Sequence, residues 1–161
     1  TEENLSRKKE CVLNLPSVNE VTAVNKLALL TGRNPVPPRK KMKGYRYEPN
    51  KFEIAGVTPM DSEVVSVPGV KECPVQMESI VTAIHPMGED EEGLRNRIVS
   101  IELKIVRIRL EDDILCPDDI NHINPDKWRP LIMSFQQFYG LGTKVAPSVL
   151  AKIPERLYKS G

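Results

Sequence analysis

The chain has 161 residues, of which 40% are hydrophobic and 28% are charged. This length and composition predict a single domain over residues 1–161 and exclude global disorder. A net charge of +1 disfavours a nucleic-acid binder that neutralises phosphates, and no apolar run is long enough for a membrane span.

The first regular pattern is an alternation over residues 9–15, KECVLNL. It places Cys11, Leu13 and Leu15 on one face, which predicts a strand with that face buried. Pro16 ends the alternation because proline cannot donate a backbone hydrogen bond.

A helix is predicted over residues 17–31. Ser17 and Glu20 have the spacing of a capping box, in which each side chain satisfies a free backbone N–H group of the first turn. Apolar residues follow at helical spacing, and Gly32 is placed to act as the C-terminal cap.

Residues 33–49 hold four prolines and predict an extended loop. A cluster of positive charge in this loop is interpreted either as a solvated surface run or as an anion site for a cofactor phosphate. Its members are Arg39, Lys40, Lys41 and Lys43. A short helical turn is predicted next, with Asn50 as its N-cap and Gly56 as its end.

Two strong strand patterns cover residues 73–84 and 98–110, joined by a polar connector. In the second strand the apolar positions change parity between Ile105 and Val106. A flat strand cannot keep one face dry across such a change, so we predict a β-bulge or bend. Bulges of this kind favour a curled sheet or barrel.

Beyond residue 110 the functional signals are weak. The acidic run 111–113 fits a cation site or acid–base chemistry, or simple solvation of a strand end. The aromatic segment 128–139 fits a core, a subunit interface or packing near a flat cofactor ring. A lone G-x-G at Gly140 and Gly142 is too little for a dinucleotide fingerprint.

No side chain is predicted to be catalytic and no metal site is predicted. The three cysteines, Cys11, Cys73 and Cys116, suit reduced thiols in a cytoplasmic protein, and the opening residues TEENLSRKKE hold no apolar signal core. Two histidines exclude a three-histidine zinc site. If the protein is an enzyme, an organic cofactor is expected to supply the chemistry.

Two motifs stand in the segment NKFEIAGVTPMDSEVVSVPGVKECPVQMES. Residues 51–59 follow the pattern K-F-x-x-A-G-L-T-P, with Val57 at the leucine position. Residues 68–78 follow the pattern P-x-V-x-E-C-P-V-x-L-E, with Met77 at the leucine position. On these residues, and over most of its length up to about residue 115, the chain resembles the flavin reductase-like family with the FMN-binding split-barrel fold.

The resemblance implies a mainly β split barrel with short helices, a homodimer, and FMN bound near the subunit interface. It also implies NAD(P)H as co-substrate, with hydride transfer to flavin N5, and neither a nucleic-acid nor a membrane partner. Thr1 and Asn4 match the family's T-x-x-N segment and are expected near the FMN phosphate and ribityl chain; Lys51 and Phe52 are expected beside the flavin. The alternatives are a helix start for the first two, surface charge for Lys51 and core for Phe52.

Family members carry a further N-terminal segment that forms the first barrel strands, whereas this sequence begins with Thr1 and shows too few strands to close a barrel. We therefore expect an N-terminally incomplete chain, rather than an open barrel whose edges a partner covers. Residues 116–161 are expected to form an extended C-terminal arm of the same domain. Two other functions stay open: a non-catalytic FMN-binding or electron-transfer module, and a structural protein that has lost the site.

Overall fold

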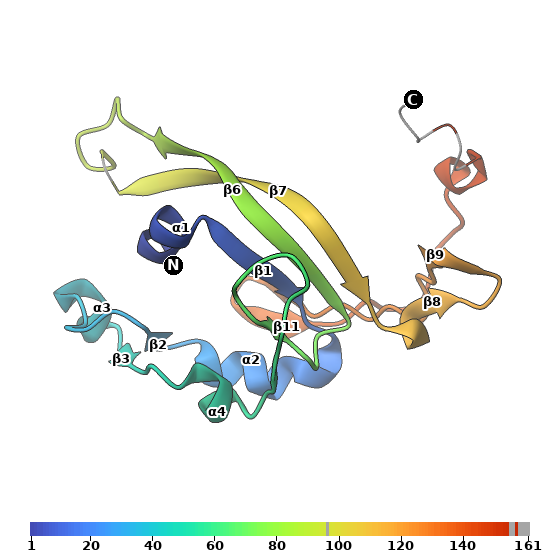
Figure 1. The fold of residues 1–161 in the computed structure, drawn as a ribbon, viewed down its shortest axis with the longest axis horizontal. Helices are drawn as coiled ribbons and strands as arrows, with labels where there is room; N and C mark the ends of the chain where they lie inside the picture. The colour runs from blue at the N-terminus through green and yellow to red at the C-terminus, as the bar shows by residue number, and fades with distance from the viewer. Residues whose placement is uncertain (96, 155–156, 158–161) are drawn as a thin grey trace.

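The main sheet is antiparallel and has the strand order β1-β6-β7 (Figure 1). The computed structural model describes residues 1–95, 97–154 and 157, and within them this sheet stays three-stranded and open. Its strands are β1 (Glu10–Leu15), β6 (Val75–Met87) and β7 (Ile98–Leu110). All three strand predictions are confirmed. Because β6 continues to Met87, the connector is shorter than predicted; its residue 96 lies outside the described residues.

The predicted bulge is present in β7. The register passes from Glu78 opposite Arg107 to Ser79 opposite Ile105, so that Val106 has no partner in β6. This extra residue restores the alternation, since it brings the apolar positions on both sides of the parity change to the same face of the sheet. A second register shift lies between Val81 and Ala83.

The two faces of the β1–β6 pair are not covered as predicted: Val75 and Ser79 are buried on the face that carries Leu13, but the apolar side chains of β1 on that face are not. The face that carries Leu13 was expected to be buried, yet Leu13 is 38% exposed. The opposite face carries Asn14 on β1 and Gln76 and Glu78 on β6, and the segment 59–73 lies over it. The alternation of apolar residues did not predict that this face is covered, because the segment 59–73 is held there by hydrogen bonds to polar side chains.

The capping box is confirmed, but the helix it begins is shorter than predicted. The Ser17 N–H donates to a carboxylate oxygen of Glu20 at 2.7 Å. The chain then forms a 3-10 turn, η1 (Val18–Glu20), and the helix α2 (Val21–Leu27). It does not continue to residue 31 because the strand β2 (Leu30–Thr31) pairs in parallel with β3 (Arg46–Tyr47). Gly32 is therefore not the helix cap.

The proline-rich segment is not wholly extended. It contains the helix α3 (Pro38–Met42), which begins with a proline in its first turn, where no backbone donor is lost. The predicted turn after it is the helix α4 (Lys51–Ala55), and Gly56 ends it in the left-handed region at φ 74°. Asn50 occupies the N-cap position without a capping hydrogen bond from its side chain.

The remaining elements are short. N-terminal to β1 lies the helix α1 (Glu2–Lys8). Pairs of small strands are formed by β4 (Pro59–Met60) with β5 (Gly69–Val70), by β8 (Leu115–Cys116) with β9 (Asp119–Ile123), and by β10 (Ile132–Ser134) with β11 (Gln137–Tyr139). Two 3-10 turns complete the described chain, η2 (Asp112–Ile114) and η3 (Val149–Lys152).

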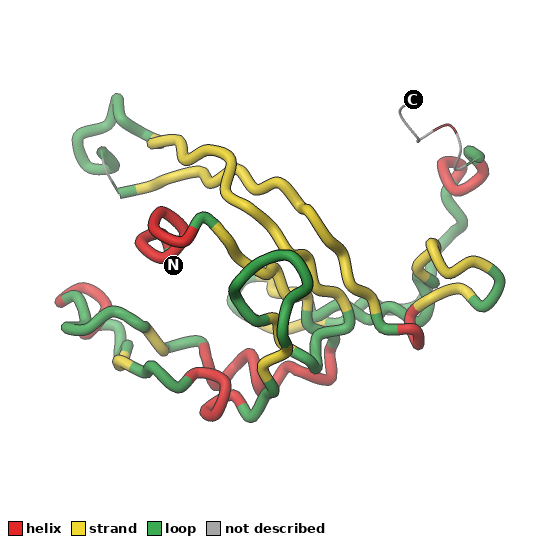
Figure 2. The backbone as a smooth tube through the Cα atoms, viewed as in Figure 1, coloured by secondary structure: helices red, strands yellow, loops and turns green. Residues whose placement is uncertain are grey.

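The C-terminal part touches the body of the protein near the end of β1. The Val18 N–H donates to the Arg129 carbonyl and the Leu131 N–H to the Pro16 carbonyl, both at 3.0 Å. Beyond β11 the described chain continues as loop with one short turn and extends away from the main sheet (Figure 2). Residues 155–156 and 158–161 of the predicted arm lie outside the described residues.

Candidate functional site

A cavity of about 710 Å³, which we call the main cavity, opens beside α1. Its walls come from α1, β1, the segment that follows β2, the helices α3 and α4, the loop before β5 and the end of the β6–β7 connector. This volume lies within the range of small-molecule and cofactor pockets, about 300–1000 Å³. Elements far apart in the sequence meet here, since the lining residues run from Thr1 to Arg97.

Three of the four residues predicted from the sequence line the main cavity. Thr1 and Asn4 lie at the start of α1, and Lys51 lies at the start of α4. Phe52 is half-buried and is not among the lining residues. Phe52 is therefore not placed at the cavity, although it stands next to Lys51 in the motif.

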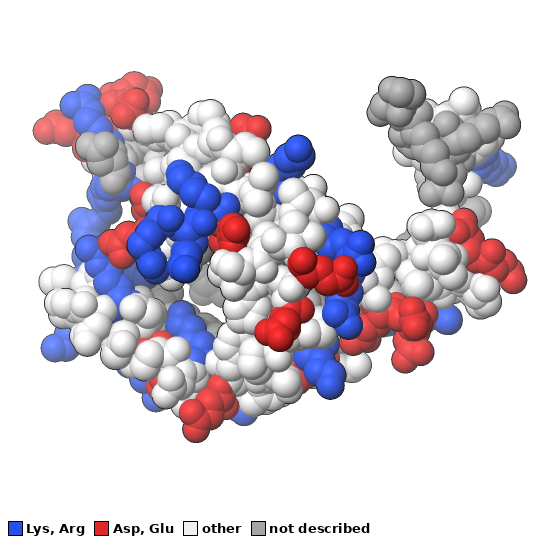
Figure 3. Space-filling view, viewed as in Figure 1, with Lys and Arg blue, Asp and Glu red and all other residues white. Residues whose placement is uncertain are grey.

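Basic side chains gather around the main cavity, and Figure 3 shows Lys and Arg around a hollow on this face. The lining holds four basic residues, Arg33, Lys40, Lys51 and Arg97, and three acidic ones, Glu2, Glu3 and Glu10. One Arg33 nitrogen lies 3.2 Å from a Glu3 carboxylate oxygen.

Only part of this basic set was visible in the sequence. Of the predicted cluster in the proline-rich loop, Lys40 lines the cavity; its ammonium lies 5.5 Å from the centre of the Tyr45 ring. Arg33 and Arg97 were not predicted. Arg97 belongs to the connector between β6 and β7, and only the fold brings that connector to α1.

One wall of the main cavity belongs to the loop 61–68, between β4 and β5, which we call the wall loop. Val67 and Pro68 line the cavity. Ser66 donates its backbone N–H and its hydroxyl to one carboxylate oxygen of Glu10, at 2.8 and 2.6 Å. These hydrogen bonds lower the pKa of the Glu10 carboxyl, led by the bond from the Ser66 hydroxyl.

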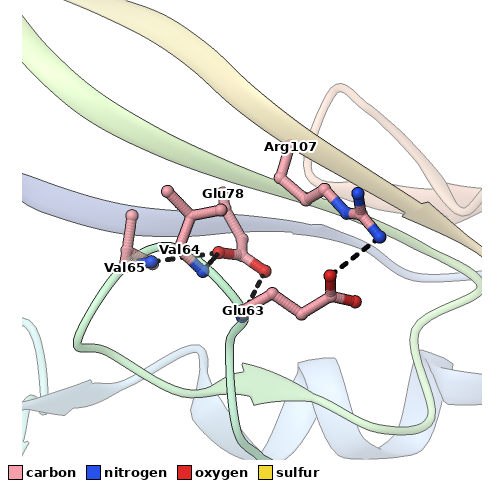
Figure 4. A network of polar contacts seen from close by, with 5 residues as sticks. All are labelled: Glu63, Val64, Val65, Glu78 and Arg107. Atoms are coloured by element: carbon pink, nitrogen blue, oxygen red, sulfur yellow. Dashed lines mark hydrogen bonds and ion pairs between the residues drawn. The ribbon is translucent and has the colours of Figure 1, made fainter.

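The wall loop has a second carboxylate partner, Glu78 on β6, which is only 6% exposed. Glu78 accepts the backbone N–H groups of Glu63, Val64 and Val65 at 2.9, 2.7 and 3.0 Å (Figure 4). Burial alone would raise the pKa of the Glu78 carboxyl, but these three donors and the nearby Arg107 together hold it below its ordinary value. Arg107 itself pairs with the Glu63 side chain at 2.8 Å.

The surroundings of Cys73 and Cys11 do not activate their thiols. Burial, and then the carboxylates of Glu20, Glu72 and Glu111, raise the pKa of Cys73 to about 11. Burial also raises the pKa of Cys11, which lines the main cavity. Both thiols therefore stay protonated at neutral pH, and neither is a ready nucleophile.

The acidic run and the aromatic segment meet at a different place. Glu111, Asp113 and Trp128 line a separate cavity of about 260 Å³. Burial raises the pKa of the Glu111 carboxyl, and the carboxylates of Asp113 and Glu20 raise it further. Phe135 is 96% exposed at the β10–β11 turn. Among the described residues, no group of three or more His, Cys, Asp or Glu side chains is placed to hold a metal ion.

One curated relative resembles the chain along most of its length. The chain is 39% identical over 143 residues to the uncharacterized protein YdfE of Bacillus subtilis strain 168, which covers 89% of this chain and 66% of the relative. The chain thus spans about two thirds of the length of this relative. No family model matches the chain.

Solved structures resemble it more distantly. Nitrilotriacetate monooxygenase component B from Bacillus cereus is 24% identical, with a TM-score of 0.67, over 91% of this chain and 63% of that one. Flavoredoxin of Desulfovibrio vulgaris (Miyazaki F) is 18% identical, with a TM-score of 0.68, over 93% and 68%. An FMN-binding domain of a flavin reductases-like enzyme from Shewanella baltica OS155 is 13% identical, with a TM-score of 0.60, over 92% and 68%.

This chain has the flavin reductase-like split-barrel fold. The fold predicted from the two sequence motifs is therefore confirmed. In this flavin reductase-like fold the first motif forms α4 and leads into β4, while the second forms β5 and the start of β6. Between them they enclose the wall loop, so the two motifs bracket one side of the main cavity. No helix among the described residues combines the length and the hydrophobicity that a bilayer crossing requires.

Proposed function

We propose that the protein binds FMN in the main cavity and is an NAD(P)H-dependent flavin reductase-like oxidoreductase. The observation that carries the proposal is the meeting of Thr1, Asn4 and Lys51 at one cavity of about 710 Å³. All three are positions that match the sequence motifs of the flavin reductase-like resemblance. The split-barrel fold and the FMN-binding domain of similar structure support the same ligand.

The donor set of the main cavity fits a phosphorylated flavin. In the proposed complex Thr1 and Asn4 bind the phosphate and ribityl chain through side-chain hydrogen bonds, and Lys51 provides a positive charge for the phosphate or a ring carbonyl. Arg33, which already lies at the cavity, is an additional cation for the phosphate. A guanidinium suits a phosphate because its planar N–H groups bind two oxygens at once.

Bound FMN would supply the redox chemistry, as the acceptor at N5 of a hydride from a nicotinamide nucleotide. The chain's own residues bind and orient the two nucleotides and exclude water from the cavity. The proposal includes a homodimer. It also includes a location in the cytoplasm, which the three free cysteines support.

The first test is an absorption spectrum of the full-length protein, followed by titration with FMN and an assay of NAD(P)H oxidation. We expect flavin bands, saturable binding, and NAD(P)H oxidation that depends on FMN. A colourless protein that does not bind added FMN contradicts the proposal.

Lys51→Ala tests the site itself. Loss of one charged contact is expected to weaken FMN binding about tenfold, since this corresponds to about 1.4 kcal/mol. Lys43→Ala is the matched control, because Lys43 is an exposed lysine that does not line the main cavity. Equal effects of the two substitutions would show that Lys51 does not contact FMN, and would not contradict the assignment of the fold.

A second candidate function is an FMN-binding electron-transfer module, which the similarity to flavoredoxin favours. It shares the site and differs in rate. Stopped-flow mixing of the FMN-loaded protein with NADH or NADPH separates the two functions, because tight FMN binding with slow or absent reduction indicates the module.

A further inference from the structure

The wall loop is anchored to the main sheet by charged side chains. Four consecutive backbone N–H groups, those of residues 63–66, donate to the carboxylates of Glu78 and Glu10. These carboxylates come from two neighbouring strands, β6 and β1, on the same face of the sheet. We call the two carboxylates and the four N–H groups the carboxylate latch.

Successive N–H groups that point to one side of a loop form a concave anion site. In this protein the site is filled by the chain's own carboxylates, so these N–H groups are not free to bind the phosphate of a ligand. Hydrogen bonds to a charged acceptor are about twice as strong as neutral ones. The latch therefore holds the loop in one conformation instead of offering a phosphate site.

The latch is connected to the main cavity in two ways. The Ser62 hydroxyl donates to the Val67 carbonyl at 2.6 Å, which fixes the loop on the cavity side of the latch. Val67 and Pro68 then form part of the cavity wall, and Glu10 itself lines the cavity. A displacement of residues 63–66 would move the surface against which a ligand packs.

We propose that Glu78 and Glu10 are positioning residues for the main cavity, which fix the wall loop before the ligand binds. They act through the backbone of residues 63–66 and not by contact with a reacting atom. A loop that is already ordered loses less conformational entropy on binding, and this difference appears as affinity. The identity of the ligand rests on the proposed function, whereas the order of the loop does not.

Glu78→Gln tests the proposal, with Glu63→Gln as its matched control. Glutamine keeps the size of the side chain but turns one oxygen into a donor, which then faces a loop N–H group. Glu63 lies in the same loop and also loses a negative charge when replaced, yet among the described residues its side chain pairs only with Arg107. We expect Glu78→Gln to weaken FMN binding about tenfold, the result of losing about 1.4 kcal/mol, and Glu63→Gln to leave it within about twofold.

Hydrogen–deuterium exchange supplies the readout that needs no flavin. In Glu78→Gln the amides of residues 63–65 are expected to exchange faster than in the unsubstituted protein, and in Glu10→Gln the amide of Ser66. If Glu78→Gln fails to fold, Glu10→Gln carries the test, with the same pair of measurements. Unchanged exchange in the folded variant, or an equal loss of FMN affinity in Glu63→Gln, overturns the proposal.

The two readouts also separate the two proposals. If the protein binds no FMN but shows the expected exchange pattern, the carboxylate latch is supported and the proposed function is contradicted. If all variants bind FMN with equal affinity, FMN binding is supported and the positioning role of Glu78 and Glu10 is contradicted.

Discussion

The two faces of the β1–β6 pair differ in the side chains that they carry and in how they are covered. One face carries Glu10, Asn14, Gln76 and Glu78, and each of these side chains hydrogen-bonds the segment 59–73 that lies over it. The other face carries mainly apolar side chains and is covered only in part, since Val75 is 3% exposed but Leu13 is 38% and Ile108 51% exposed. The polar face is therefore the one that positions the main cavity.

This difference shows that polarity and exposure are separate properties of a strand. A polar side chain becomes buried at little cost when a backbone segment satisfies its hydrogen bonds. Gln76 illustrates this, because its amide donates to the carbonyls of Val70 and Cys73. Specific hydrogen bonds give the covering segment a unique position, which non-directional apolar contacts would not.

The largest expected effect is the loss of the buried carboxylate. Glu78→Ala leaves three loop N–H groups without their acceptor, and we expect it to lower the free energy of unfolding by about 3 kcal/mol. Ile108→Ala on the apolar face is expected to cost about 1 kcal/mol or less, because the side chain is already half exposed. Urea unfolding of both variants measures the difference, and equal losses would break the comparison.

An exchange of side-chain types across β1 is expected to have the next largest effect. Asn14→Leu removes the acceptor of the Val70 N–H group, a 2.8 Å hydrogen bond, and should lower the free energy of unfolding by about 1–2 kcal/mol. Leu13→Asn on the apolar face should cost less. Thermal unfolding of the two single variants tests this order; the reverse order would mean that the apolar face is covered at Leu13 in the folded protein.

Acid should loosen the polar face selectively, with the smallest effect of the three. The folded-state pKa values of Glu10 and Glu78 lie below the ordinary value of 4.5. Their contribution to stability is therefore present above pH 4.5 and is lost as the pH falls below it. The effect is smaller than that of Glu78→Ala because a protonated carboxyl keeps one acceptor oxygen.

Glu111 should behave in the opposite way. Its folded-state pKa is raised, so it favours the folded state below pH 4.5 and loses this contribution as the pH rises through its folded pKa. Unfolding free energies measured from pH 3 to pH 7 for Glu78→Gln and Glu111→Gln check both signs. We expect the decrease in unfolding free energy at acidic pH to be smaller in Glu78→Gln and to remain in Glu111→Gln.

Local patterns in the sequence predicted the local structure well. The bulge followed from the parity change after Ile105, the capping box from the spacing of Ser17 and Glu20, and the end of α4 from Gly56. The end of α2 was mispredicted, because it depends on the pairing of Leu30 and Thr31 with residues that lie sixteen positions further along, Arg46 and Tyr47.

The candidate site was predicted only where a motif marked it. Thr1, Asn4 and Lys51 carry the family resemblance and line the main cavity, whereas Phe52 belongs to the same motif and does not. No pattern pointed to Arg97 or to the partners of Glu78. Glu78 was recognisable as a motif residue, but its function depends on a loop that starts more than ten residues earlier in the chain.

The sequence by itself determined the three strands of the main sheet, the capping box, the helix α4 and the fold, because these depend on side-chain periodicity, on short-range hydrogen bonds and on two motifs. The tertiary structure alone decided which face of the sheet is covered, which residues meet at the main cavity, and that two carboxylates hold its wall. The reason is physical: both faces of β1 have residues that tolerate burial, and only the path of the segment 59–73 decides which face this segment covers.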